Sequence, residues 1–243
     1  MLAVFVNCGA ILVGSLIGLI FAKKITDAFS VAFSTAAGII VLVLGVKMAL
    51  EYQNIIFLTL SLIIGGLLGT VLDCDGKILQ FGSFLERKLL RRNTVTEDEH
   101  SGKNFAHAFL DASVLFCVGG MSIIGSIQAG VEADYTTIFT KSILDGFMAI
   151  VFCSAMGVGT AFSIIPLFLY QGALTLASTV IAPHIGDAML AEITAIGGCL
   201  IIMIAINLLE LKNIKTANFL FAIFIVPIFY ILEPYFQKIM ELF

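Results

Sequence analysis

The sequence predicts an all-α, polytopic transmembrane helical bundle, and composition and the lengths of the apolar segments are the observations that predict it. Of the 243 residues, 60% are hydrophobic and 12% are charged, and the mean hydropathy is +1.08. Soluble domains carry roughly 25% charged residues. Because a soluble fold of this length must still cover itself with polar surface, we expect lipid to solvate most of this chain.

The apolar segments predict about eight membrane spans in a single membrane domain over residues 1–243. A helix needs about 20 mostly apolar residues to cross the hydrocarbon core. The predicted spans are 2–22, 28–50, 55–72, 105–128, 137–157, 160–182, 187–209 and 216–234. Only Gly157–Thr160 separates the fifth span from the sixth, so one long bent helix, and hence seven spans, is the alternative. The polar stretch 73–103 is predicted to be the soluble loop.

The distribution of basic residues predicts the orientation. Cytoplasmic loops of membrane proteins carry an excess of Lys and Arg. We therefore expect loop 73–103 to be cytoplasmic and the protein to lie in a bacterial cytoplasmic (inner) membrane as a multi-pass protein. This assignment puts Lys23, Lys24, Arg87, Lys88, Arg91, Arg92, Lys212 and Lys215 inside, and Glu51, Glu132, Asp134, Asp187 and both termini outside.

An internal similarity suggests an inverted repeat of spans one to three and six to eight. Residues 35–55 align without a gap on residues 194–214, with Thr, Ala, Gly, Glu, Asn and Ile recurring at one offset. Five spans separate the starts of the two units, so the units have opposite orientations. Such repeats are typical of secondary transporters. The alternative is a chance alignment of apolar segments.

The remaining composition excludes several classes of partner. The formal net charge of −4, with no basic face, argues against nucleic acid. The five cysteines have no CxxC spacing, and neither a metal site nor a cofactor is predicted. The nucleotide-binding pattern GxxxxGK[ST] is missing, so ATP is not expected to drive this chain. The bilayer and an unidentified small solute or ion remain as predicted partners.

The segment 116–130 carries the strongest signal of a site. It contains four glycines, with Ser126 and Gln128 beside them. Glycine weakens a helix, and unwound backbone at membrane depth must line a cavity. We predict that Gly119 and Gly120 open such a site. Close helix packing through small residues is the alternative.

Two charged residues, Lys141 and Asp145, lie four apart within the fifth span. A charge at the bilayer centre costs ~2.5–3.5 kcal/mol on insertion scales, so such residues usually mark pathways. We predict that Asp145 binds an ion or solute, with Lys141 as its partner. A structural ion pair is the alternative.

Further polar residues complete the candidate site. Asn7, Gln171 and Glu192 lie within spans and could converge near the midplane. His107 and Asp111 lie in the first turns of the fourth span, where we expect them to be interfacial and solvated. Gly14–Gly18 and Gly65–Gly69 have the spacing of close helix contacts, either within the chain, which we favour, or between copies in a homo-oligomer.

The string Phe116-Cys-x-Gly-x-Met-x-Ile-x-Gly-Ser-Ile-x-x-Gly130, followed by Lys141-Ser-x-Leu-Asp-Gly146 and Tyr170-Gln-Gly172, resembles the YqgA-like family of bacterial inner-membrane proteins. The resemblance covers essentially the whole chain. It implies a polytopic cytoplasmic-membrane protein of a family of unknown function, described in places as transport proteins, and brings no substrate or catalytic residues.

Three functions fit these observations. A secondary transporter or ion-conducting protein is favoured by the repeat, the glycines and the Lys141/Asp145 pair. A membrane scaffold or assembly partner is the second. An intramembrane enzyme is the least favoured, because HExxH, GxSxG and GxGD are missing and the orientation puts Asp111 and Asp145 at different depths.

Overall fold

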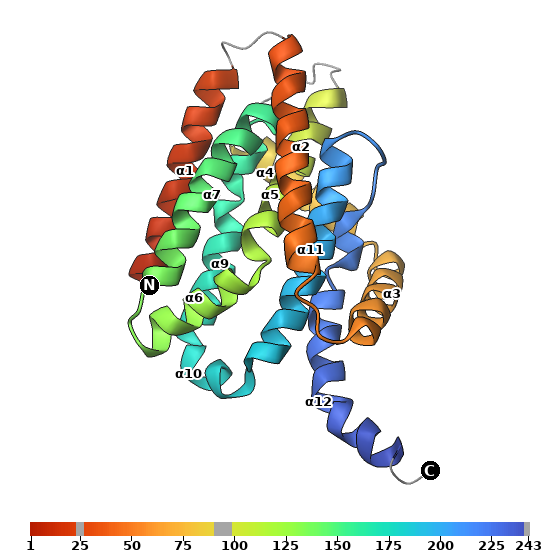
Figure 1. The fold of residues 1–243 in the computed structure, drawn as a ribbon. Helices are drawn as coiled ribbons and strands as arrows, with labels where there is room; N and C mark the ends of the chain where they lie inside the picture. The colour runs from red at the N-terminus through yellow and green to blue at the C-terminus, as the bar shows by residue number, and fades with distance from the viewer. Residues whose placement is uncertain (23–26, 90–98, 241–243) are drawn as a thin grey trace.

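The four longest helices among the described residues form the body of the bundle. They are α1 (Leu2–Ala22), α2 (Asp27–Ala49), α7 (Thr136–Met156) and α11 (Asp187–Leu208). In this computed structural model, which describes residues 1–22, 27–89 and 99–240, α1 packs along α7 and α2 packs along α11 (Figure 1). The protein is thus an all-helical bundle, as predicted, and no strand occurs in the described ranges.

Shorter helices complete the bundle. Helix α4 pairs with α5, α6 lies against α9, and α12 lies against α3. Two neighbouring pairs are sharply bent, α3 to α4 by 58° and α5 to α6 by 59°. The bounds are α3 Ile55–Val71, α4 Cys74–Leu89, α5 Glu99–Cys117, α6 Gly120–Val131, α8 Gly159–Phe162, α9 Ile164–Leu176, α10 Ser178–Ile181, η1 Ala182–His184, η2 Thr216–Phe219 and α12 Ala222–Met240.

The number of possible spans in the described part of the chain is smaller than the number predicted. Within the described residues, four helices are long and apolar enough to cross a membrane, or six if each bent pair is one span. The predicted count of eight is therefore not confirmed. The predicted span 105–128 is two helices, and 216–234 begins with a 3-10 turn. A break does separate the fifth predicted span from the sixth, because Gly157 has φ +89°, a conformation that ends α7.

The stretch 73–103, predicted to be a soluble loop, is helical at residues 74–89, which form α4, and at its end, where α5 begins at Glu99. Helix α4 is amphipathic. Ile78 and Leu79 pack against the core, and the ring of Phe81 lies 6.2 Å from that of Phe109 on α5. Its charged residues made the segment resemble a loop, although apolar side chains of the helix pack against the core. Residues 90–98, with Arg91 and Arg92, lie outside the described residues, as do Lys23 and Lys24.

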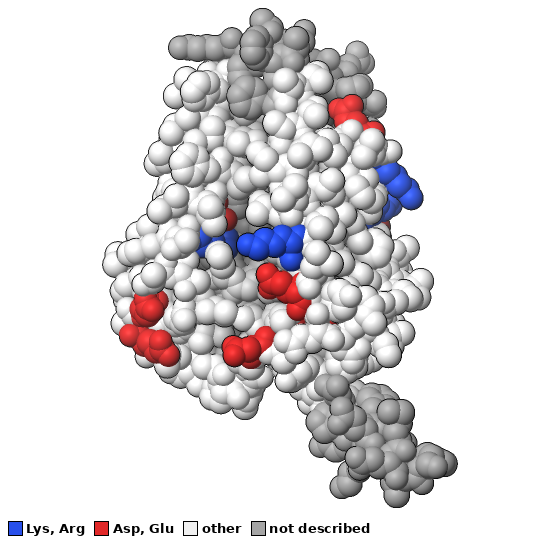
Figure 2. All heavy atoms as spheres, in the orientation of Figure 1, with Lys and Arg blue, Asp and Glu red and all other residues white. Residues whose placement is uncertain are grey.

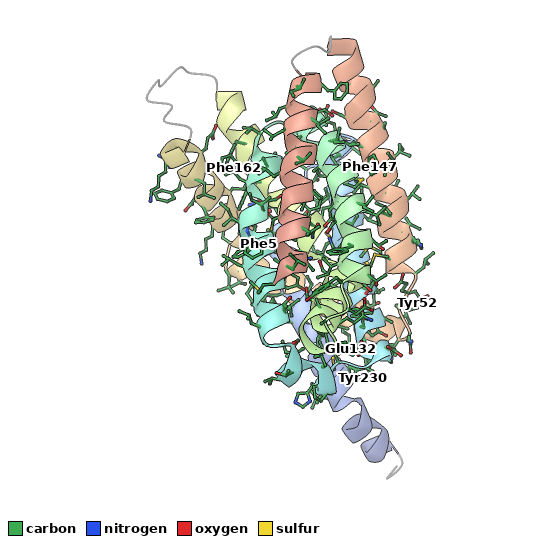
Figure 3. The ribbon with its side chains drawn as sticks, turned by 90° about the vertical axis from the view of Figure 1, so that its left-hand side faces the viewer. Phe5, Tyr52, Glu132, Phe147, Phe162 and Tyr230 are labelled. Carbon is green, nitrogen blue, oxygen red and sulfur yellow. The ribbon has the colours of Figure 1, made fainter. Side chains whose placement is uncertain are left out.

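Helix α1 is organised for lipid, with its polar and small residues inside. Asn7, Gly14, Ser15 and Gly18 are buried, whereas the large apolar residues Leu2, Phe5, Leu16 and Ile20 are exposed. Phe5 and Phe147 lie on the outer surface of α1 and α7 (Figure 3). This pattern is the reverse of that in a soluble helix and is expected where lipid tails surround the bundle.

Helix α11 is the central element. Buried residues make up 72% of its most apolar stretch, compared with 33% in α1. It runs antiparallel to α2, since Gly38 faces Leu209 and Gly45 faces Ile202. The core around it includes Phe116, Phe152 and Leu200. Helices α5, α7 and α11 therefore meet at the centre of the protein.

Glycines bring the backbones of α1 and α7 into contact. A methyl group added at Gly14 would collide with the carbonyl oxygen of Gly146, and one added at Gly18 with that of Ile150. The prediction that Gly14–Gly18 serves packing within the chain is confirmed. This close approach also brings the polar residues of α1 within reach of α7.

We predict that Gly14→Leu destabilises the protein, whereas Gly9→Leu does not. A side chain at position 14 must push α1 away from α7, and overpacking typically costs ~1–3 kcal/mol. Gly9 lies on the same helix with nothing within 4 Å of its added methyl group. Thermal unfolding of the purified variants in detergent measures the difference. Equal midpoints for the two variants would contradict the packing argument.

Candidate functional site

The helix break between α5 and α6 creates the candidate site. Gly119 has φ +138° and ψ +146°, a conformation that is open to glycine and strained for other residues. Because the helix stops there, the carbonyl oxygen of Phe116 loses its partner four residues on. The Nζ of Lys141 donates to this oxygen at 2.9 Å, and the Ser122 hydroxyl donates to it at 3.1 Å.

Lys141 also forms an ion pair with Asp145, one turn further along α7. Both residues are buried, with 5% and 8% exposure. The ammonium group thus connects the carboxylate to the C-terminal end of α5, where the helix dipole favours a positive charge. Asp145 and Lys141 therefore hold α5 and α7 together at the break.

Two amides extend this network to α1 and α9. The Nδ2 of Asn7 donates to Asp145 and to the Oε1 of Gln171, both at 3.1 Å. The Nε2 of Gln171 donates to the Ser122 hydroxyl at 3.2 Å. The Oδ1 of Asn7 is buried and has no partner. The network joins α1, α6, α7 and α9 around one buried ion pair.

A cavity of about 460 Å³ adjoins this network, and we call it the central cavity. It lies between α2, α5, α6, α7 and α11, and Gly119, Gly120, Lys141 and Asp145 are on its wall. Figure 2 shows basic and acidic atoms gathered in a hollow in the middle of the face shown. The further charged residues of the cavity are Lys47, Glu51 and Asp187; most of the others are apolar.

The predicted site residues fall into two groups. Lys141, Asp145, Asn7 and Gln171 share the network, and Gly119 and Gly120 line the central cavity. The other three predicted residues lie outside the network and do not line the central cavity. They are Gln128, Ser126 and Glu192.

Glu192 and Gln128 connect elements of the fold. The Oε1 of Glu192 accepts from the backbone N–H groups of Gln53 and Asn54, at 3.0 and 2.6 Å, and so holds the turn between α2 and α3. Gln128 accepts from the Thr137 hydroxyl at 2.7 Å and ties α6 to α7. Ser126 is fully buried with no hydrogen-bond partner.

The expectation that Asp111 is solvated is wrong. Its side chain is 3% exposed, because α4 and α11 cover this part of α5. Asp111 and His107 line a second cavity, which does not include Asp145. Asp111 and Asp145 therefore do not share a cavity as a catalytic carboxylate pair would. Among the described residues, no group of three or more His, Cys, Asp or Glu side chains could hold a metal ion.

Sequence reasoning placed Ser122 beside the glycines without listing it as a candidate site residue, and it did not select Lys47 or the Phe116 carbonyl. Ser122 lies between the selected glycines and Ser126, and Lys47 is a charged residue inside a predicted span. These features could have signalled a role. The free carbonyl could not be inferred, since it depends on where the helix breaks and on which side chain reaches it.

An apolar-faced helical bundle with a buried charged network is the architecture of a polytopic membrane protein. The chain belongs to the family described as "Protein of unknown function (DUF554)", which it matches over residues 2–231.

Two relatives span nearly the whole chain. It is 32% identical over 226 residues to the "Uncharacterized membrane protein YdfK" of Bacillus subtilis (strain 168), covering 91% of this chain and 92% of that protein. It is 25% identical over 216 residues to the "Uncharacterized protein YqgA" of Escherichia coli (strain K12), covering 89% and 90%. No solved structure matches the chain.

We predict that Lys141→Met destabilises the protein by ~3–5 kcal/mol, because it leaves the Asp145 carboxylate buried without its counter-charge. The double variant Lys141→Met/Asp145→Leu should recover much of this loss. Unfolding of the wild type, both single variants and the double variant gives the coupling energy. Additive effects of the two substitutions would show that the pair is not coupled.

Proposed function

We propose that the protein is a secondary transporter or ion-conducting protein for a small solute or ion, with the central cavity as its binding site. The observation that carries the proposal is the Lys141–Asp145 pair on the wall of that cavity. Ionisable residues inside a membrane protein mark substrate and ion pathways by default. A pair that served only to join helices would be expected to lie between them, away from open space.

The surroundings of the pair support solute binding. The cavity volume of about 460 Å³ falls within the range of small-molecule sites. Its wall is mostly apolar, with a few charged groups that can orient a ligand. The N-terminal end of α6 lies at Gly120 on this wall and has no side-chain cap. Broken helices with free ends at the binding site are a recurring feature of transporters.

We also propose that the repeat predicted from the sequence is genuine. In its support, the two aligned helices, α2 and α11, pack on one another in antiparallel orientation. The helices that follow them, α3 and α12, also pack together. Inverted repeats are expected to meet around a pseudo-two-fold axis in the membrane plane. A rocking motion of one unit against the other would then open the central cavity to each side in turn.

The energy source in this proposal is an ion or proton gradient, because the sequence has no nucleotide-binding loop. Asp145 would bind the cation or a substrate amine. Lys141 would give up its ion pair with Asp145 when that ligand binds. The glycines at 119 and 120 would allow α6 to move relative to α5.

We predict that a ligand of the central cavity stabilises the wild type and not Asp145→Asn. The screen uses purified protein in detergent with inorganic ions, amino acids, carboxylates and amines, and follows thermal unfolding. A ligand at 100 times its dissociation constant should stabilise by ~2.7 kcal/mol. Glu132→Gln, an exposed substitution between α6 and α7, is the matched control and should respond as the wild type.

Two outcomes would count against this function. A ligand that stabilises Asp145→Asn as strongly as the wild type binds outside the site described. If no compound stabilises folded wild type and a partner protein copurifies with it, the scaffold hypothesis replaces the transporter.

We propose that the protein lies in the cytoplasmic membrane with the C-terminal ends of α7 and α11 inside. The charge distribution supports this orientation. Lys212 and Lys215 follow α11, whereas Glu132 and Asp134 precede α7 at the other end of the bundle (Figure 1). An excess of basic residues is expected on the cytoplasmic side.

Cysteine labelling tests this orientation. In a cysteine-free background, Glu132→Cys should react with a membrane-impermeant maleimide on intact cells, because its loop faces outward. Lys212→Cys should react only after the cells are permeabilised. The reverse pattern would invert the topology.

A further inference from the structure

A second cavity, of about 340 Å³, lies at the end of the bundle where α11 ends, and we call it the end cavity. An adjoining hollow of about 280 Å³ shares His107, Asn207 and Glu210 with it. The end cavity is lined by His107 and Asp111 of α5, Met156 of α7, and Asn207, Leu208, Glu210, Lys212 and Asn213. Polar residues thus outnumber apolar ones here, in contrast to the central cavity.

Asp111 is the buried charge of this cavity. Its side chain is 3% exposed, yet no hydrogen bond or ion pair to it is formed within the described part of the chain. A buried carboxylate without a donor or a counter-charge is strongly disfavoured. None of the described residues supplies a counter-charge, and Asp111 lines a cavity, which gives a cation from solution room to approach the carboxylate.

The groups that face Asp111 do not neutralise it. His107 lies one turn earlier on α5 and is partly buried, but it is not within ion-pair distance. Asp75 of α4 is a second carboxylate nearby, and its Oδ1 accepts from the backbone N–H of Ala217 at 3.3 Å. From the end of α11, Glu210 adds another negative charge, while Lys212 is exposed and unpaired with Asp111.

The loop after α11 is fixed by hydrogen bonds beside Asp111. Asn207 accepts from the N–H of Ile214 at 2.7 Å and donates to its carbonyl oxygen at 2.9 Å, which closes the loop on itself. Glu210 has φ +55°, an uncommon conformation for this residue type. The wall of the end cavity is therefore a fixed turn, and it leaves space over Asp111.

Helices α5, α7 and α11 line both cavities, and the two cavities approach each other along them. On α5, Asp111 lines the end cavity and Leu115, one turn later and about 6 Å along the axis, lines the central cavity. On α11 the corresponding residues are Leu208 and Ile201, which are about 10 Å apart along the axis. Ile204, which lies between them, is fully buried. An apolar barrier of one to two helical turns thus separates the cavities.

We propose that the end cavity is a binding site for a small cation, either a proton or Na⁺, held by the Asp111 carboxylate on the far side of this barrier from the Lys141–Asp145 pair. The site requires no solute in the central cavity. It therefore goes beyond the proposed function and stands or falls separately. In a transporter, a cation at this position would occupy the opposite end of the pathway from the solute.

Thermal unfolding of the purified full-length chain in detergent tests the site. One series replaces choline chloride by NaCl at constant ionic strength, and a second moves from mildly alkaline to mildly acidic pH without Na⁺. A cation that binds the native state more tightly than the unfolded chain raises the unfolding temperature. We expect one of the two series to stabilise the wild type, and Asp111→Asn to lose that response completely.

Three further variants make the result specific. Glu132→Gln, at the other end of the bundle, should keep the wild-type response. His107→Gln should also keep it, because the cation binds the carboxylate and not the imidazole. If Asp111→Asn does not fold, Asp111→Ser takes its place, since it also removes the charge without adding volume.

The two series distinguish the cation. Stabilisation by Na⁺ at constant pH identifies a Na⁺ site, and stabilisation only on acidification identifies a proton site. The proposal is overturned if the wild type responds in neither series, if Asp111→Asn responds as the wild type does, or if the response is lost in His107→Gln and kept in Asp111→Asn.

Discussion

Two opposite charges, Lys141 and Asp145, lie inside an apolar bundle, and the arrangement of its centre depends on keeping them satisfied. The break at Gly119 frees the Phe116 carbonyl, which the Lys141 ammonium needs as a second partner. The close contact of α1 with α7 brings Asn7 to the Asp145 carboxylate. Without the glycines that permit this approach and this break, the ion pair would be short of donors and acceptors in a medium that supplies none.

The same constraint explains why the charged residues of the bundle are distributed unequally. The central cavity contains an ion pair whose members neutralise one another, within a mostly apolar wall. The end cavity contains Asp111, a buried carboxylate that has no such partner among the residues the structure describes, within a polar wall. In the proposed function a ligand of the central cavity must compete with Lys141 for Asp145, whereas a cation in the end cavity meets no such competitor among the described residues. The two proposed sites, separated by an apolar barrier, would suit a protein that couples the movement of a solute to the movement of a cation.

The sequence predicted the long helices well because their signal is local. The predicted spans 2–22, 137–157 and 187–209 coincide within a residue with α1, α7 and α11. Hydrocarbon thickness sets the length of such helices, and apolar composition reveals it directly. Helix α4 was missed because its polar residues resemble those of a loop, although Ile78 and Leu79 pack into the core. The bend between α5 and α6 was signalled by the glycines at 119 and 120, but its angle was not predictable.

By itself the sequence determined that this protein is a helical membrane protein, and it indicated Lys141, Asp145 and the glycines of 119–120 as unusual residues for such a setting. Those conclusions need only the cost of placing charge and unpaired backbone in lipid. Only the tertiary structure decided which side chains meet. Asn7 reaches Asp145 across 138 residues of sequence, whereas Glu192 binds the backbone of the turn between α2 and α3. The burial of Asp111 was equally hidden, because it depends on how α4 and α11 pack over α5, and packing between distant segments leaves no local trace in composition.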